Sequence, residues 1–126
     1  MVSIKTDCKI LYVEDEFITR FEVMNMLNDR YTSVFTAKNG IAGLQIFEDN
    51  DIDIVITDIK MPEMDGIEMC SKIRDINKTV VIIVVSAFEK EFFKMDNLNI
   101  SEFIVKPITK FSLYNIIDKY YNEHHR

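Results

Sequence analysis

Short apolar runs alternate along this chain with longer segments in which apolar residues recur at helical spacing. Three of the runs, residues 10–13, 54–56 and 80–85, are continuous and rich in β-branched side chains. Such runs are typical of parallel strands that are buried on both faces of a sheet. Two other runs, residues 33–37 and 102–105, are more mixed in polarity, as edge strands are. The pattern therefore predicts five strands, three of them central.

Between these runs, apolar residues recur at spacings of three and four, which is the period of an amphipathic helix. The alternation of five strands with five helices predicts an α/β fold with a doubly wound parallel sheet. Central and edge positions agree with the flavodoxin-like strand order 2-1-3-4-5. The residues that mark the five expected helices are Phe17, Phe21, Met24 and Leu27; Ile41, Leu44 and Phe47; Ile67, Cys70, Ile73 and Arg74; Phe88, Phe92 and Met95; and Leu113, Ile116, Ile117, Tyr120 and Tyr121.

The composition narrows the class of protein. A length of 126 residues fits one domain, residues 1–126. The 15 basic and 21 acidic residues give a net charge of −6, which repels nucleic acid and anionic membranes, so neither is an expected direct partner. No apolar stretch has the length of a signal peptide or a membrane span. We expect a soluble, cytoplasmic protein whose two cysteines, Cys8 and Cys70, stay reduced.

Charged or hydroxyl-bearing side chains follow four of the apolar runs in the sequence. Glu14 and Asp15 follow the first run, Asp58 follows the third, Ser86 the fourth and Lys106 the fifth. Open α/β sheets bind ligands beyond the carboxyl ends of their strands, so these groups are expected to converge on one rim. Each residue also has an ordinary alternative, as a helix cap, a turn residue or a solvated lysine. Their joint occurrence at strand ends favours a common functional site over these separate structural roles.

The chemistry of these residue types is mutually consistent. Three crowded carboxylates repel one another, and Mg²⁺ relieves that repulsion because it prefers carboxylate, phosphate and water oxygens. A carboxylate nucleophile can form an aspartyl-phosphate. Lys106 and the hydroxyl of Ser86 would offer positive charge and a donor to the incoming phosphoryl oxygens. The residues therefore predict a Mg²⁺-dependent phosphoryl site.

Four segments, ILYVEDE, TDIKMPEMDG, VVSA and FIVKP, resemble in order and spacing the receiver domains of two-component response regulators, the CheY-like superfamily. The resemblance covers nearly the whole chain. It implies that Asp58 is the phospho-acceptor and that Lys106 pairs with the phosphate. It also implies that Asp15 holds Mg²⁺ directly, that Glu14 does so through water, and that the backbone carbonyl of Lys60 is a further metal ligand.

The resemblance implies a switch and its partners as well. Ser86 corresponds to the hydroxyl that turns toward the phosphoryl group, and Phe103 to the switch aromatic. Lys60 and Phe88 flank the approach of water and so bear on the lifetime of the phosphoryl group. The expected partners are a histidine kinase or phosphotransfer protein, and a downstream protein or second copy. The latter would bind through the face made by the fourth helix, the fifth strand and the last helix.

The chain departs from the usual pattern of the family at three positions. Glu14 stands where Asp is commoner, and Ser86 stands where Thr is frequent, which keeps the hydroxyl. Asn99 replaces the glycine that usually precedes the fifth strand, and because Asn tolerates a left-handed backbone we expect the turn to survive. The Lys106–Pro107 peptide is usually cis in this family and is expected to be cis here.

Other functions remain open at this point. A receiver-like interaction module that is never phosphorylated is one, and a haloacid-dehalogenase-like phosphatase is another. The phosphatase would carry a second Asp two residues beyond its nucleophile, where Lys60 stands. We expect no enzymatic activity beyond the protein's own phosphorylation and dephosphorylation. The adjacent His124 and His125 are expected to be solvated, and the sequence is compatible with a stand-alone regulator or a part of a longer protein.

Overall fold

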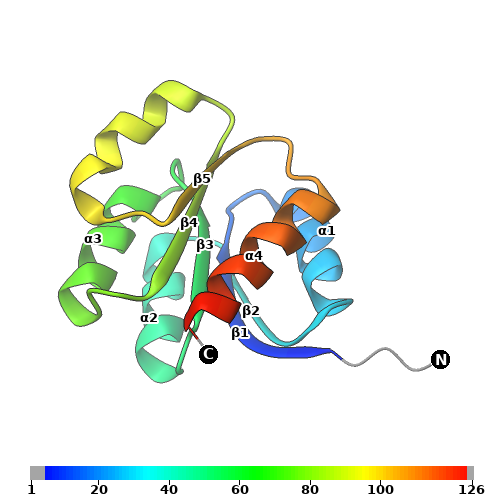
Figure 1. Ribbon diagram of the computed structural model, residues 1–126. Coiled ribbons are helices and arrows are strands. Elements are labelled where there is room, and N and C mark those ends of the chain that lie inside the picture. The colour runs from blue at the N-terminus through cyan, green and yellow to red at the C-terminus, as the bar shows by residue number, and fades with distance from the viewer. Residues whose placement is uncertain (1–4, 125–126) are drawn as a thin grey trace.

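A five-stranded parallel sheet in the order β2-β1-β3-β4-β5 forms the centre of the protein, which confirms the predicted fold (Figure 1). The computed structural model describes residues 5–124, and the expectation for the side chains of His124 and His125 lies outside what it describes. The two mixed runs are the edge strands β2 and β5, as predicted. The strands are β1 (Thr6–Val13), β2 (Tyr31–Ala37), β3 (Ile54–Asp58), β4 (Val81–Ser86) and β5 (Glu102–Val105).

Five helices cover the sheet, two on one face and three on the other (Figure 1). Helices α1 and α4 pack on the face that carries Ile10 and Tyr12, whereas α2, α3 and the 3-10 helix η1 pack on the face that carries Leu11 and Val13. Successive strand residues point to opposite faces, so a strand covered on both sides must be apolar throughout. The helices are α1 (Phe17–Asn28), α2 (Gly40–Asp49), α3 (Gly66–Ile76), η1 (Glu89–Leu98) and α4 (Lys110–His124).

The apolar stripe predicted for α1 is wrong in its first two residues. Phe17 is 68% exposed and Phe21 is 50% exposed, and their rings stack on each other at the surface with centroids 6.2 Å apart. Val23 and Leu27, which are also four residues apart, pack against the sheet instead. Ile41, which was predicted to belong to the apolar stripe of α2, also lies at the surface and is 53% exposed.

The fourth helix also differs from its predicted form. The spacing of Phe88, Phe92 and Met95 favours an α-helix, but η1 is a 3-10 helix over its whole length. Met95 is fully buried, whereas Phe88 precedes the helix and is 55% exposed. The helix ends at Asn99, whose φ of 52° lies in the left-handed region. The expectation that Asn99 replaces a turn glycine is therefore confirmed.

The buried guanidinium group of Arg74 holds the end of η1 to its neighbours. It donates hydrogen bonds to the backbone oxygens of Leu98 (2.8 Å), Asn99 (2.7 Å) and Val80 (2.8 Å). Burial lowers the pKa of Arg74. The charge of Arg74 is therefore compensated by the dipoles of neutral carbonyl groups. The same hydrogen bonds connect α3 to the start of β4 and to the turn before β5.

The loop after β3 fixes the position of Asp58. The N–H of Gly66 donates to the backbone oxygen of Ile59 at 2.7 Å, and Asp65 caps α3 by accepting from the N–H of Glu68 at 2.9 Å. A Cβ atom at Gly66 would lie 2.1 Å from the backbone oxygen of Asp58, so any side chain there would push the helix away from the strand end. Only glycine permits this approach.

The Lys106–Pro107 peptide is cis, as expected from the family resemblance. No helix in residues 5–124 combines the length and the apolar character that a membrane span requires.

Candidate functional site

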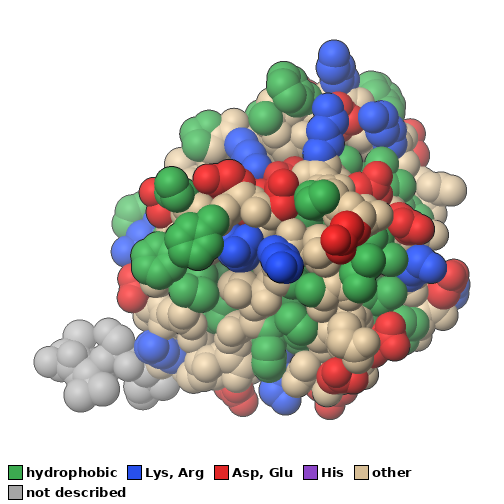
Figure 2. Space-filling view, turned by 180° about the vertical axis from the view of Figure 1, so that it is seen from behind, with side chains coloured by type: hydrophobic (Ala, Val, Ile, Leu, Met, Phe, Trp, Pro, Cys, Tyr) green, Lys and Arg blue, Asp and Glu red, His purple; other side chains and the backbone are tan. Residues whose placement is uncertain are grey.

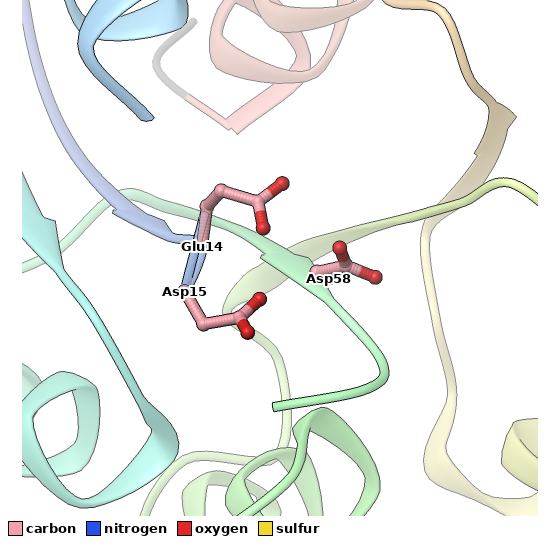
Figure 3. A group of neighbouring side chains, drawn as sticks. All are labelled: Glu14, Asp15 and Asp58. Carbon is pink, nitrogen blue, oxygen red and sulfur yellow. The ribbon is translucent and has the colours of Figure 1, made fainter. Parts of the chain in front are cut away.

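Three carboxylates meet at the carboxyl rim of the sheet (Figure 3). Glu14 and Asp15 follow β1 directly, and Asp58 is the last residue of β3. Strands β1 and β3 are neighbours, with Val13 opposite Thr57, so the residues that come next are brought side by side. One carboxylate oxygen from each of the three acids lies within 4.8 Å of the others, which confirms that the predicted rim residues converge.

Lys106 supplies the positive charge of the rim. Its ammonium nitrogen lies 2.6 Å from Oδ2 of Asp58 and 2.9 Å from Oε1 of Glu14. Burial opposes the charge of Lys106, but its hydrogen bonds to the two carboxylates outweigh burial, and the pKa of Lys106 is raised. One cation therefore contacts two of the three carboxylates, and its single positive charge leaves the cluster with a net negative charge.

The two adjacent acids differ in their surroundings. Glu14 is 1% exposed; Lys106 binds one of its oxygens, and the N–H of Glu16 donates to the other at 3.2 Å. Burial raises the pKa of Glu14 despite these donors. Asp15 is exposed, and its carboxylate forms no ion pair with any described residue. Glu14 is thus engaged by protein groups, and Asp15 faces solvent.

Both oxygens of the Asp58 carboxylate are oriented by donors. The N–H of Ile59 donates to Oδ1 at 2.7 Å, and Lys106 donates to Oδ2. The Asp58 side chain is 14% exposed, so it is accessible from the rim but restricted in rotation. A carboxylate held in this way is suited to act as a nucleophile toward a group that arrives from solvent.

Ser86 ends β4, which pairs with β3, and the residue before it, Val85, lies opposite Asp58. Its hydroxyl oxygen accepts a hydrogen bond from the N–H of Phe88 at 3.1 Å. Its backbone oxygen accepts one from the N–H of Lys106 at 2.8 Å. In this structure the hydroxyl therefore stabilises the turn that leads into η1.

Lys60 and Phe88 lie together beside this rim. The ammonium nitrogen of Lys60 is 5.7 Å from the centroid of the Phe88 ring and 3.1 Å from a carboxylate oxygen of Glu91. Lys60 is therefore not simply solvated, and Phe88 does not begin a core stripe. Sequence analysis missed Glu91, because nothing in the spacing of Lys60 and Glu91, which are 31 positions apart, indicates that they pair.

Phe103 lies on the edge strand β5 and is 36% exposed. Its ring packs against that of Phe92 on η1, with centroids 4.6 Å apart. The aromatic residue predicted to act as a switch thus connects β5 to η1 at the surface.

The carboxylate cluster fits Mg²⁺. All of its donors are hard oxygen atoms, and Mg²⁺ usually takes one or two protein carboxylates and keeps several waters. Asp15 is exposed and the side chain of Asp58 is 14% exposed, whereas Glu14 is only 1% exposed. Asp15 and Asp58 are therefore suited to direct contact with the ion, and Glu14 to contact through water.

Comparison with known proteins identifies the family. Residues 10–118 match the family described as the response regulator receiver domain. Because this match spans most of the chain, the protein belongs to the receiver domain family, and the resemblance seen in the sequence is confirmed. Receiver domains are signalling domains of two-component systems rather than conventional enzymes, and they bind Mg²⁺ at an acidic pocket.

Individual relatives agree with this assignment. A probable transcriptional regulatory protein of Picosynechococcus is 32% identical over 91% of this chain and 48% of its own length. The chain therefore spans about half the length of that relative. The N-terminal domain of an uncharacterized Wolinella succinogenes protein is 31% identical, with a TM-score of 0.87 over 93% of this chain and 96% of that one. The response regulator TrrA of Thermotoga maritima, solved in complex with Mg²⁺ and BeF, is 30% identical, with a TM-score of 0.79 over 90% of this chain and 98% of that one.

Mg²⁺ is expected to stabilise the folded protein by binding at the rim. At ten times its dissociation constant, an ion that binds only the folded state adds about 1.4 kcal/mol to the free energy of unfolding. Thermal melts with and without millimolar Mg²⁺ measure this. Asp15→Ala should remove most of the Mg²⁺-dependent shift and Glu14→Ala less, whereas Asp75→Ala, which removes an exposed carboxylate on α3, should keep it. A wild-type melt that does not respond to Mg²⁺ would contradict the site.

Proposed function

We propose that this protein is a phosphoacceptor signalling domain that takes a phosphoryl group onto Asp58 and thereby changes its binding to a partner. The donor is a histidine kinase, a phosphotransfer protein or a small phosphodonor, and the reaction depends on Mg²⁺. The observation that carries the proposal is the pairing of Lys106 with Asp58 and Glu14 beside the open carboxylate of Asp15.

In the proposed reaction, a carboxylate oxygen of Asp58 attacks the phosphorus atom of the donor. A new P–O bond forms, and the bond from phosphorus to the donor's leaving nitrogen or oxygen breaks with its electron pair. Lys106 already donates to Asp58 and can pair with an oxygen of the phosphoryl group. Ser86 can donate its hydroxyl proton to another after turning from the N–H of Phe88.

Bound Mg²⁺ would supply further positive charge to the phosphoryl oxygens. Asp15 and Asp58 would hold the ion directly, Glu14 through water, and the backbone carbonyl of Lys60 would complete the protein ligands. TrrA, which is 30% identical, was solved with Mg²⁺ and BeF, and this relationship supports the same site here.

The output of the proposed switch is a change of the face formed by η1, β5 and α4. Phe103 and Phe92 are in contact there, and Phe93 and Phe111 are each 77% exposed. When Ser86 moves toward the phosphoryl group, the turn it stabilises changes and Phe103 can rotate inward. The partner is a downstream protein or a second copy of the chain. Elsewhere on the molecule, hydrophobic side chains reach the surface in several separate groups among charged ones (Figure 2).

Two further points belong to the proposal. Residues 1–126 act as one receiver domain whose output is protein contact rather than direct binding of nucleic acid or membrane. The protein acts in the cytoplasm, because the ATP from which a histidine kinase obtains its phosphoryl group is held there.

Acetyl phosphate with Mg²⁺ is expected to add one phosphoryl group to the wild type, because the only nucleophile required is the carboxylate of Asp58. Intact mass spectrometry measures the addition. Asp58→Asn should gain none, whereas Asp75→Asn, a control at an exposed carboxylate, should gain as much as the wild type. Equal phosphorylation of Asp58→Asn would contradict the assignment. A wild type that gains nothing would favour an interaction module that is never phosphorylated.

Beryllofluoride, as a mimic of the phosphoryl group, is expected to change amide hydrogen exchange in η1, β5 and the start of α4. The reason is that Ser86 leaves the N–H of Phe88 and frees the first turn of η1. Ser86→Ala should reduce these changes while keeping those at the rim. Changes confined to the rim in the wild type would count against the switch.

Phe88 is expected to lengthen the life of the aspartyl-phosphate, since its exposed ring crowds the approach of water and offers it no hydrogen bond. Phe88→Ala and Phe88→Glu should speed the loss of the phosphoryl group. A tenfold effect would correspond to about 1.4 kcal/mol of barrier. The measurement is the decay of phosphorylated protein after the donor is removed. Equal lifetimes in all three proteins would mean that Phe88 does not control access of water.

A further inference from the structure

A second group of charges lies next to the phosphoryl site and is not explained by it. Glu91, on η1, has one carboxylate oxygen 3.1 Å from the ammonium of Lys60 and the other 2.7 Å from that of Lys94. The side chain of Glu91 is 8% exposed, whereas those of Lys60 and Lys94 are 70% and 58% exposed. A nearly buried carboxylate thus lies between two exposed cations.

Glu91 contacts both Lys60 and Phe88, the two residues that the family resemblance assigns to the approach of water to Asp58. Its side chain pairs with Lys60, and its backbone N–H donates to the backbone oxygen of Phe88 at 3.0 Å. Lys60 and Phe88 in turn contact each other, with the ammonium 5.7 Å from the ring centroid. The three residues therefore form a closed set of contacts that joins the loop after β3 to the start of η1.

Lys60 would not stay over the Phe88 ring through that contact alone. A cation over an aromatic ring at an exposed position is weakly attracted, and a lysine side chain loses considerable rotamer freedom when it is fixed. The ion pair with Glu91 supplies the second point of attachment. Lys94 lies 2.7 Å from the other oxygen of Glu91, so it does not compete with Lys60 for the same oxygen.

We propose that Glu91 is a positioning residue that slows hydrolysis of the aspartyl-phosphate by holding Lys60 against Phe88. In that hydrolysis a water oxygen attacks the phosphorus, the P–O bond to Asp58 breaks, inorganic phosphate leaves and a proton passes to solvent. The Lys60 side chain, with its ammonium nitrogen kept over the Phe88 ring, narrows the path of this water. The inference rests on the proposed function, since it concerns the lifetime of a phosphoryl group on Asp58.

The test is the decay of phosphorylated protein in a double-mutant cycle of Glu91→Gln and Lys60→Ala. Glu91→Gln keeps the size of the side chain but removes its charge, and we expect a lifetime about threefold shorter than in the wild type, equivalent to about 0.65 kcal/mol of barrier. Lys60→Ala should shorten the lifetime as well. In the Lys60→Ala background, Glu91→Gln should have no further effect, because Glu91 acts through Lys60. A merely structural role of Glu91 would shorten the lifetime equally in both backgrounds and would overturn the proposal.

Two controls separate the ion pair from other effects. Lys94→Ala removes the other partner of Glu91 without touching Lys60 and should leave the lifetime close to that of the wild type. An effect as large as that of Glu91→Gln would assign the change to η1 itself and contradict the proposal. Glu91→Asp, which retains the charge, should restore at least part of the wild-type lifetime, and no recovery would also contradict it.

A separate measurement needs no phosphoryl group. Acetylation of Lys60 by an N-hydroxysuccinimide ester, followed by peptide mapping against exposed Lys72, should be faster in Glu91→Gln than in the wild type. Unchanged acetylation would overturn the link between Glu91 and Lys60. If the wild type takes no phosphoryl group, the proposed function fails and this role fails with it. Equal lifetimes in variants that are phosphorylated on Asp58 overturn the role of Glu91 alone.

Discussion

The ammonium group of Lys106 lies between the carboxylates of Asp58 and Glu14, and the arrangement of the whole rim depends on it. A buried carboxylate such as Glu14 is strongly destabilising unless a cation and other donors compensate its charge. Lys106 comes from the end of β5 and reaches across to the ends of β3 and β1, so the contact joins residues 92 positions apart in the chain. It orients the carboxylate of Asp58, and it leaves Asp15 as the carboxylate that faces solvent.

Most of the fold could be predicted from the sequence, because runs buried on both faces must be apolar and β-branched. The strand order followed from the contrast between continuous and mixed runs. The orientation of helices was less predictable. Phe17 and Phe21 recur at helical spacing as well as Val23 and Leu27 do, and periodicity alone does not say which stripe faces the sheet. The 3-10 form of η1 was not visible either, since the same apolar spacing is compatible with an α-helix.

The acidic cluster and Lys106 were predictable because parallel strands all end on one rim, so residues that follow different strands must meet. The position of strand ends does not predict which loop residues contact which helix residues. The pair formed by Lys60 and Glu91 joins two separate segments whose distance depends on how η1 packs. The sequence therefore indicated the groups to which we assign the chemistry, but not the contacts around them. The metal contact of the Lys60 carbonyl and the movement of Phe103 stay predictions.

Arg74 restrains the C-terminal end of η1 more strongly than any single contact restrains its N-terminal end. At the C-terminal end, its guanidinium group binds the carbonyls of Leu98 and Asn99 together with that of Val80, so displacing this end exposes an unsolvated charge and several acceptors at once. The N-terminal end is held near the rim by single contacts of Ser86 and Lys60, each of which can be exchanged for another partner at little cost. We therefore expect a chemical change at the rim to displace the first turn of η1 more than its last turn, because Arg74 holds the carbonyl of Asn99 in place.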